Sequence, residues 1–351
     1  MSIPFLAARH VEAAVSPAEA VEAVRDAFAA YARGEWTMPP KVYVPAYPAG
    51  DFRAMPALGA GHALLKWVTS FPGNPARGLP TVTGLVLLSD ASDGSLKAVL
   101  DTGVVTALRT GAAAVLAAET LGRDESSATV VGVGVNGRAA ARTFLARGRD
   151  VVLWDVDSER ARSAARELGA RVAASREEAL GADLVVTVTP GHQVLFAEGS
   201  LRAGQHVSLM GADGPGKSEI ALAELARVHA FCDNWEKHGP FPIPGHRRHL
   251  GPPVITDARG RLVCDDWQQA SHGGDLARAV AESLISREDV ATLGDILIGA
   301  APGRQSDGDI TVFDSTGLAI QDLAVALAAY ERYRAEPNSP DYTDVIGFEL
   351  D

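Results

Sequence analysis

The feature that most constrains the fold is the run Gly132-Val133-Gly134-Val135-Asn136-Gly137. It follows the apolar run 128–131 and opens a helical segment that extends through Arg147, with Gly148 as its stop. Such a glycine-rich turn between a strand and a helix is typical of dinucleotide-binding folds. Gly132 permits the tight turn, Gly134 lets the backbone approach a pyrophosphate, and Gly137 lets the helix pack closely on the strand.

The pattern around this turn predicts two different sheets. After it, apolar strands at 151–154, 184–188 and 206–210 alternate with helical stretches such as 158–168, which predicts a parallel, doubly wound sheet. Before it, runs with a period of two follow one another without helices between them, which predicts a largely antiparallel sheet. These runs lie at 41–44, 64–68, 81–88 and 96–100. The further helices expected are one within 11–33, with Ser16-Pro17 as its start signal and Gly34 as its stop, one at 104–121 and an amphipathic helix at 317–333.

The fold class expected is therefore α/β, with a Rossmann-type domain of doubly wound parallel sheet beside a domain built on a mixed or antiparallel sheet. A chain of 351 residues has the length of two ordinary domains.

Composition narrows the class of protein. The formal net charge of -12 argues against a nucleic-acid partner, because phosphate binding needs a clustered positive surface. Cys232 and Cys264 are the only cysteines, so a reducing compartment is expected rather than a disulfide framework. The first residues show no signal-peptide pattern, and no apolar run reaches the ~18 residues of a membrane span. We expect a cytoplasmic protein without a membrane partner.

The glycine turn and Asp155 predict the cofactor. Asp155 follows the second strand of the parallel sheet, at the spacing of a carboxylate that binds the adenosine ribose hydroxyls. A carboxylate there repels a 2′-phosphate and favours NAD over NADP, although the nearby Arg160 could soften that preference. The alternative is a glycine-rich turn that binds no nucleotide. The candidates for cofactor binding in this domain are Gly132, Gly134, Asn136, Gly137, Asp155, Thr187 and Thr189.

Basic residues in unusual surroundings suggest a substrate site. Lys66 is flanked by apolar side chains, and Arg109 enters a stretch of small residues where a buried cation needs a partner. A guanidinium matches a carboxylate bidentately, so Arg53, Lys66 and Arg109 could together hold an amino-acid carboxylate. Taken singly, these residues and Lys41 are more often solvated surface charges, and spacing alone does not show that they meet.

Asp213 is the candidate acid/base. It lies in the loop 211–217, which follows an apolar strand of the predicted parallel sheet. Ligand clefts in such sheets form beyond the carboxyl ends of the strands. The alternative is a turn or helix-capping aspartate ahead of Ser218-Glu219.

A near repeat marks one further region. Phe231-Cys232-Asp233-Asn234-Trp235 and Val263-Cys264-Asp265-Asp266-Trp267 are near copies, and a surface insertion beside a duplicated strand end is the simplest interpretation. His238, His246 and His249 lie between the copies. They form no H-x-x-x-H pair on a helix, so we predict no metal site.

Longer blocks across the chain carry a resemblance to a family. In order they are 38–43, 51–57, 66–68, 78–81, 108–113, 211–217 and 313–322. With these blocks the chain resembles the ornithine cyclodeaminase/mu-crystallin family, most closely its archaeal-type alanine dehydrogenase branch.

The resemblance implies a homodimer. Its sheet domain, from 1–122 and 310–351, would bind substrate and mediate pairing, and 123–309 would be the NAD-binding domain with an insertion at about 234–262. It further implies that Lys41, Arg53, Lys66 and Arg109 surround the substrate and that Asp213 is the acid/base. The residues that it places near the cofactor are Thr110, Ser315 and Thr316.

The activity expected is oxidation of the CH–NH2 group of a small L-amino acid, with hydride transfer to NAD and hydrolysis of the imine to a 2-oxo acid and ammonia. Arg53 and Arg109 would orient the carboxylate, Lys66 would stabilise developing charge, and Asp213 would move protons. The alternatives are ammonia-eliminating cyclisation of a diamino acid, imine or ketimine reduction, and a non-enzymatic nucleotide-binding role. Asp213 together with Lys66 argues against the last, because a pure binder needs no acid/base.

Overall fold

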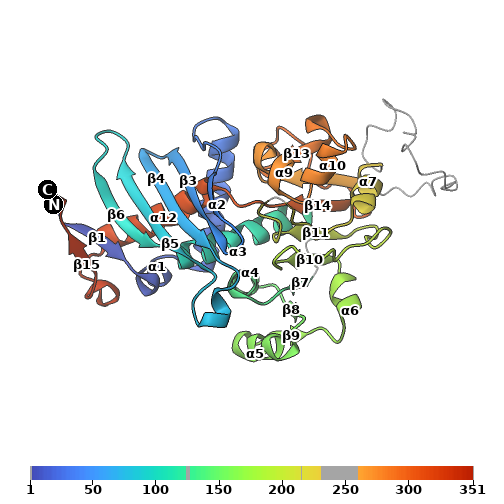
Figure 1. Ribbon diagram of the computed structural model, residues 1–351, viewed down its shortest axis with the longest axis horizontal. Helices are drawn as coiled ribbons and strands as arrows, with labels where there is room; N and C mark the ends of the chain where they lie inside the picture. The colour runs from blue at the N-terminus through green and yellow to red at the C-terminus, as the bar shows by residue number, and fades with distance from the viewer. Residues whose placement is uncertain (1, 124–126, 215, 231–259, 351) are drawn as a thin grey trace. The chain divides into compact units, whose positions relative to one another are not determined.

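The structure, a computed structural model, describes residues 2–123, 127–214, 216–230 and 260–350 and forms two compact units (Figure 1). The first unit comprises Met1–Leu116, Gly134–Arg149 and Gly317–Asp351, and the second comprises Ala117–Val133 and Asp150–Thr316. The assignment of substrate binding and pairing to one domain and of NAD to the other stays a prediction.

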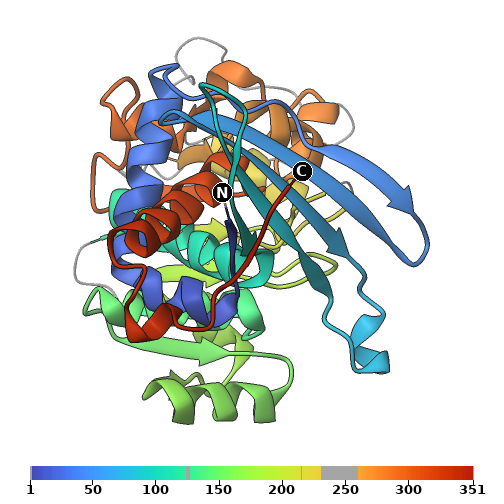
Figure 2. The same ribbon diagram turned by 90° about the vertical axis from the view of Figure 1, so that its left-hand side faces the viewer.

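The first unit is built on a mixed sheet of seven strands among its described residues, in the order β15-β1-β6-β5-β4-β3-β2 (Figure 2). All neighbours are antiparallel except β1 and β6, so the sheet is largely antiparallel as predicted. The strands are β1 (Ile3–Leu6), β2 (Val42–Ala46), β3 (Gly50–Gly59), β4 (His62–Ser70), β5 (Val82–Asp90), β6 (Leu96–Asp101) and β15 (Ile346–Phe348).

β3 was not predicted as a strand, and Pro56 in its middle explains why. Proline cannot donate to a sheet ladder and therefore argues against an internal strand. β2 pairs only with residues 50–54 of β3, so Pro56 lies beyond the end of β2 and removes no hydrogen bond to it.

The helices of the first unit differ from the expectation in two places. The helix predicted within 11–33 begins at its expected start signal, because Ser16 caps α2 through Glu19 with Pro17 in its first turn. The residues before that signal form a separate short helix, α1, which was not predicted. The last helix, predicted to be amphipathic, is buried on almost all sides from Ala319 to Tyr330, because it packs between the sheet and α2. The helices are α1 (Ala8–Ala14), α2 (Pro17–Ala32), α3 (Thr102–Leu121, which runs on into the second unit), α4 (Val135–Ala146) and α12 (Ala319–Ala335).

The second unit is built on a parallel sheet of eight strands within its described part, in the order β13-β12-β14-β11-β10-β7-β8-β9. From β7 the chain continues through β8 and β9 on one side and through β10 and β11 on the other, which is the doubly wound topology, and β14 lies between β11 and β12. This confirms the predicted fold class. The strands are β7 (Ala128–Val131), β8 (Val151–Trp154), β9 (Arg171–Val172), β10 (Leu184–Thr187), β11 (His206–Leu209), β12 (Gly260–Cys264), β13 (Val290–Thr292) and β14 (Ile310–Asp314).

Short helices connect these strands. In α5, Asp157 caps the first turn and the left-handed Gly169 ends the last, as strand–helix alternation requires. The helices are α5 (Ser158–Leu168), α6 (Arg176–Leu180), α7 (Leu222–Ala230), α9 (Trp267–Gly273), α10 (Ala277–Ala281) and α11 (Leu293–Leu297). The first copy of the near repeat and nearly all of the expected insertion, with its three histidines, lie outside the described residues.

Only α3 among the described helices is long and apolar enough to cross a membrane by length and composition. Most of its apolar stretch is buried in the structure, as in the core helix of a globular protein.

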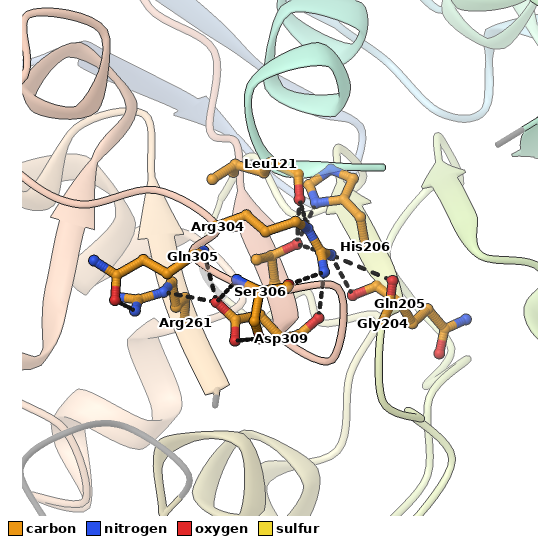
Figure 3. Close-up of polar contacts among 10 residues, drawn as sticks. Leu121, Gly204, Gln205, His206, Arg261, Arg304, Gln305, Ser306 and Asp309 are labelled. Atoms are coloured by element: carbon orange, nitrogen blue, oxygen red, sulfur yellow. Dashed lines mark hydrogen bonds and ion pairs between the residues drawn. The ribbon is translucent and has the colours of Figure 1, made fainter. Parts of the chain in front are cut away.

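Arg304 holds three parts of the second unit together (Figure 3). Its guanidinium donates to Leu121 O at 2.6 Å, to Asp309 O at 2.7 Å and to Gly204 O at 3.3 Å. It also donates to Thr311 Oγ1 at 3.2 Å. The end of α3, the turn before β11 and the start of β14 are therefore tied to one side chain.

Candidate active site

Lys66 lies on the inner face of the first unit's sheet. Along β4 the even-numbered residues 64, 66 and 68 are buried and the odd-numbered 65 and 67 are exposed, which is the period of two of a half-buried strand. Lys66 is only 1% exposed, and its ammonium donates to Thr106 Oγ1 at 2.7 Å and to Asp322 Oδ1 at 2.9 Å. The alternative of a solvated surface lysine is therefore wrong.

Arg109, on α3, meets the same carboxylate. Its Nε lies 3.4 Å from Asp322 Oδ1, and its Nη1 donates to Gln321 Oε1 at 3.2 Å. Gly317 lies against the guanidinium: it has a φ of 76°, and a Cβ there would stand 2.5 Å from Arg109 Nη1. Only glycine fits this approach, which explains the small residue at the start of α12.

Arg53, on β3, belongs to the same group. It forms a bidentate pair with Asp51, at 2.6 Å and 3.3 Å, and its guanidinium lies over the ring of Tyr43 at 5.2 Å. Its charge acts on Lys66, as does that of Arg109, so the structure brings three of the predicted substrate-site residues together. Lys41 lies immediately before β2, and its role stays a prediction.

The charges of this basic cluster, defined as Arg53, Lys66 and Arg109 with the carboxylates of Asp51 and Asp322, leave one positive charge in excess. Burial lowers the pKa of Lys66 to about 8, and Arg109 and Arg53 add to the effect while Asp322 opposes it. A substrate carboxylate would neutralise the excess.

Two buried polar atoms beside the cluster, Asp322 Oδ2 and Gln321 Nε2, have no hydrogen-bond partner among the described residues. Buried polar atoms are normally paired, so these two mark a place for polar groups of a ligand.

The glycine turn has the geometry that a dinucleotide requires. Gly132 has a φ of 92°, and a Cβ on it would lie 2.7 Å from Val188 O, so a larger residue cannot make this turn. Gly134 is the N-cap of α4, and the position of its missing Cβ is open space. The first amides of α4 therefore have no side-chain cap, and a helix N-terminus of this kind suits a pyrophosphate. Asn136 and the buried Gly137 follow within the first turn of α4.

Asp155 lies directly after β8, as predicted, and is 7% exposed. Its carboxylate accepts the Val133 amide at 2.8 Å and the Asp157 amide at 2.9 Å, so it ties the end of β8 to the glycine turn. Arg160 Nη1 lies 3.4 Å from it. The carboxylate thus stands at the position expected to bind a ribose, with the Arg160 guanidinium beside it.

The hydroxyls of four other cofactor candidates are engaged with buried carboxylates. Thr187 and Thr189 donate to Glu219 at 2.6 Å and 2.5 Å. Ser315 and Thr316 donate to Asp265 at 3.2 Å and 3.1 Å.

Thr110 is buried within α3, and its hydroxyl has no hydrogen-bond partner in the described part of the chain. Like the other candidates, it stays a prediction as a cofactor-binding residue.

Asp213 lies in the loop after β11, and its carboxylate pairs with Lys217 Nζ at 2.5 Å. The side chain is 37% exposed, so it can exchange protons with water. It caps no helix, because α7 begins only at Leu222. The role of Asp213 as the acid/base stays a prediction.

Sequence reasoning missed Asp322, Glu219 and Asp265. All three residues carry a carboxylate and are at most 2% exposed. For Asp322 the signal was present as a charged residue in a largely apolar run, the same signal that identified Lys66. Glu219 and Asp265 have charged or polar neighbours in the sequence, so local context gave no such signal for them.

No group of three or more His, Cys, Asp or Glu side chains within the described ranges could hold a metal ion. The three histidines of the expected insertion are outside those ranges.

A doubly wound unit with a dinucleotide-type turn and a second unit whose sheet carries a buried basic cluster together define the class: a two-unit protein of the nucleotide-dependent oxidoreductase type. The profile of the ornithine cyclodeaminase/mu-crystallin family matches residues 3–239 and 247–336. The chain belongs to this family, and the resemblance noted from the sequence blocks is confirmed.

The chain is also similar to individual proteins with a named activity. The chain is 39% identical to alanine dehydrogenase of Archaeoglobus fulgidus over 341 residues, covering 94% of this chain and 95% of that one. It is 32% identical to a Δ1-pyrroline-2-carboxylate reductase of Bacillus cereus, covering 79% and 80%. A solved archaeal alanine dehydrogenase dimer with bound NAD matches with a TM-score of 0.84 at 36% identity, covering all of both chains. The expectation of an enzyme is confirmed by these relatives.

Proposed function

We propose that the chain is an NAD-dependent amino-acid dehydrogenase of the alanine dehydrogenase type. It oxidises the CH–NH2 group of a small L-amino acid to an imine, which water converts to a 2-oxo acid and ammonia. The observation that carries this proposal is the buried pairing of Lys66 and Arg109 on Asp322, with Arg53 beside them and one positive charge in excess. The similarity to an alanine dehydrogenase over almost the whole chain supports it.

NAD, when bound, supplies the acceptor for the hydride. The open N-terminus of α4 fits its pyrophosphate and Asp155 fits its adenosine ribose. The residues proposed to hold it are those predicted from the sequence and the family: Thr110, Gly132, Gly134, Asn136, Gly137, Asp155, Thr187, Thr189, Ser315 and Thr316. The hydroxyls of Thr187, Thr189, Ser315 and Thr316 already donate to buried carboxylates. We therefore propose that they contact the cofactor as hydrogen-bond acceptors.

The remaining chemistry belongs to side chains of this protein. Arg53 and Arg109 hold the substrate carboxylate and thereby orient Cα, and Lys41 adds positive charge at the rim. Lys66, as an ammonium, stabilises negative charge that develops on oxygen as water adds to the imine carbon. Asp213 accepts the proton of that water and returns it to the departing amine.

Two other reactions would use the same residues. In a cyclodeaminase the substrate's own side-chain amine attacks the imine and the hydride returns, so reduced cofactor does not accumulate. In a reductase the hydride step runs from reduced cofactor to an imine, as the pyrroline-carboxylate reductase relative suggests. A nucleotide-binding role without catalysis is the fourth possibility.

A substrate panel separates these functions. Purified protein is given NAD and single amino acids, and NADH absorbance, ammonia and organic products are followed together. We expect equal amounts of NADH, ammonia and 2-oxo acid from alanine or another monoamino acid. Conversion of ornithine to proline without net NADH would identify a cyclodeaminase instead. Oxidation of NADH only with cyclic imines would identify a reductase, and NADH binding without any turnover would leave the binding role.

We further propose that the enzyme works as a cytoplasmic homodimer. The outer face of the first unit's sheet is apolar: Trp67 stacks on Phe52, and the residues beside them are exposed by 37% to 56%. This apolar face comprises Val42, Val44, Phe52, Leu65, Trp67 and Leu85. An exposed patch of this kind marks an interface, and a second copy would cover it. The archaeal alanine dehydrogenase that matches this chain is itself a dimer.

A further inference from the structure

Glu219 joins the carboxyl ends of β10 and β11 in the second unit. Its side chain is fully buried. Oε2 accepts the Thr187 hydroxyl at 2.6 Å and the Gly211 amide at 2.9 Å. Oε1 accepts the Thr189 hydroxyl at 2.5 Å and the Thr189 amide at 3.2 Å. Each carboxylate oxygen thus receives one backbone amide and one hydroxyl.

These contacts close the loop that carries Asp213. Gly211 is the first residue of that loop, and Glu219 stands just beyond its last residue, Lys217. The Glu219 side chain therefore bonds the start of the loop from its end. A Cβ on Gly211 would lie 2.5 Å from Glu219 Cδ, so the carboxylate packs directly on the backbone.

The backbone of Glu219 is fixed as well. Its amide donates to Asp275 Oδ1 at 2.6 Å, and its carbonyl accepts the amides of Leu195 and Phe196 at 2.6 Å and 3.1 Å. Asp275 is itself 1% exposed. The side chain that closes the loop is thus anchored at its own Cα and has little freedom to follow a moving loop.

Two backbone amides on two different oxygens require acceptors at both positions. A carboxylate supplies them, whereas an amide side chain has only one acceptor oxygen. Burial raises the pKa of the Glu219 carboxyl, and the four donors act in the opposite direction.

We propose that Glu219 is a positioning residue that holds Asp213 in place for proton transfer by closing the loop 211–217. The proposal rests on the proposed role of Asp213. Glu219 touches neither substrate nor reacting atoms in this account and acts only through the loop.

Glu219→Gln tests the proposal with the least change of shape. It sets an NH2 group against one of the two backbone amides, so the loop loses its closure. Glu224→Gln is the matched control: Glu224 is also fully buried in the second unit and accepts the amides of Gly199 and Leu201 at 2.6 Å and 2.7 Å. Both variants lose the same kind of contact, but only one loss falls on the Asp213 loop.

Two readouts are taken on the full-length protein. Amide hydrogen exchange of the segment 206–214 is expected to accelerate in Glu219→Gln and to stay unchanged in Glu224→Gln. The kcat for amino-acid oxidation is expected to fall about 10- to 100-fold in Glu219→Gln, as small misplacements of a catalytic group do, with the KM for the amino acid changed less than about twofold. Glu224→Gln is expected to keep its kcat.

Unchanged exchange or unchanged kcat in Glu219→Gln would overturn the proposal, as would an equal loss of kcat in Glu224→Gln. If Glu219→Gln does not fold, Gly211→Ala replaces it, since the added Cβ pushes on the same carboxylate, and the same pattern is expected. A wild type that oxidises no amino acid would overturn the proposed function and the catalytic half of this proposal, whereas the exchange result tests loop closure by itself.

Discussion

At the scale of single residues, the proposed substrate site depends on one carboxylate, that of Asp322. Its Oδ1 receives both Lys66 and Arg109, and without it two buried cations would face each other unneutralised. Uncompensated buried charge is among the most costly changes in a protein. Asp322 therefore keeps Lys66 charged, against the burial that lowers its pKa to about 8.

This charge state predicts how carboxylate binding depends on pH. Below about pH 8 Lys66 is an ammonium, so in the proposed site its charge would attract a carboxylate together with those of Arg53 and Arg109. Above that pH it loses its proton and the attraction weakens. We expect the inhibition constant of propionate, which has no amine of its own to titrate, to rise about tenfold for each pH unit well above 8. Lys66→Arg should flatten this rise, because arginine stays charged.

Lys97→Arg is the control for that substitution, since Lys97 pairs with Asp90 outside the cluster and should leave the profile unchanged. A propionate profile in Lys66→Arg that matches the wild type would contradict the assignment of the cluster as the carboxylate site.

Sequence alone could identify part of this site for a physical reason. Lys66 and Arg109 stand among apolar or small neighbours in the chain, so local context shows that they need partners. Their partner Asp322 is 256 residues away from Lys66, and Glu219 is 32 residues away from Thr187. Such pairings are produced by tertiary packing, which no local pattern contains.

At the scale of secondary-structure elements, the buried His206 makes the second unit's sheet sensitive to acid, and it lies near Arg304 (Figure 3). The Thr311 hydroxyl donates to Leu121 O at 3.0 Å, so its oxygen can only accept from His206 Nδ1 at 2.8 Å. His206 is therefore the neutral tautomer with its proton on Nδ1. Burial, together with the nearby Arg304, lowers the pKa of His206 to about 3.

A lowered histidine pKa makes the folded state sensitive to acid. The unfolded chain binds a proton near the ordinary value of 6.5, whereas folded His206 does not until about 3, so stability is lost as the pH falls below 6.5. Because of His206, we expect the free energy of unfolding to fall by about 1.4 kcal/mol per pH unit between pH 6.5 and pH 3. The difference between wild type and His206→Gln in urea unfolding isolates this contribution.

The wild type must be compared with the variant because other buried groups also change the stability with pH. Burial raises the pKa values of Asp275 and Asp314, so these two residues change the free energy of unfolding in the opposite direction. His192→Gln, at an exposed histidine, is the control and should keep the wild-type slope. Equal slopes in wild type and His206→Gln would contradict the neutral, buried state of His206.

Strands that are covered on both faces could be predicted from the sequence. Elements whose form depends on distant parts of the chain could not. The strands at 128–131 and 151–154 were located from apolar runs, because both faces of a parallel strand are covered. β3 was missed because it contains Pro56, and proline normally argues against an internal strand. Here β2 is too short to reach Pro56, so the missing N–H removes no hydrogen bond to β2. The burial of α12 on almost all sides depends on α2, a helix that begins 302 residues earlier in the chain, at Pro17 rather than Ala319.

At the scale of the whole molecule, the apolar face of the first unit is the feature that predicts assembly. Its side chains belong to four adjacent strands, β2 to β5, so it is one continuous surface rather than scattered exposed residues. A surface of this kind favours association, and a second copy with the same face is the simplest partner.

A charge placed on this face should weaken the dimer. Leu85→Glu would bury a carboxylate in the interface, and we expect the dissociation constant of the dimer to rise about a hundredfold or more, measured by sedimentation. Val194→Glu is the matched control, because Val194 is 48% exposed, close to the 43% of Leu85, but belongs to the second unit and not to this sheet. A dimer that is equally stable in both variants would place the interface elsewhere.

The central claim is that hydride leaves Cα of a small amino acid for NAD and does not return. The measurement that tests it most directly uses L-alanine carrying deuterium at Cα, with the reduced cofactor and ammonia analysed after several turnovers. We expect one deuterium in each NADH formed and one ammonia released with it. NADH without deuterium, or ammonia released from a diamino acid with no NADH formed and the deuterium back in a cyclic product, would contradict it.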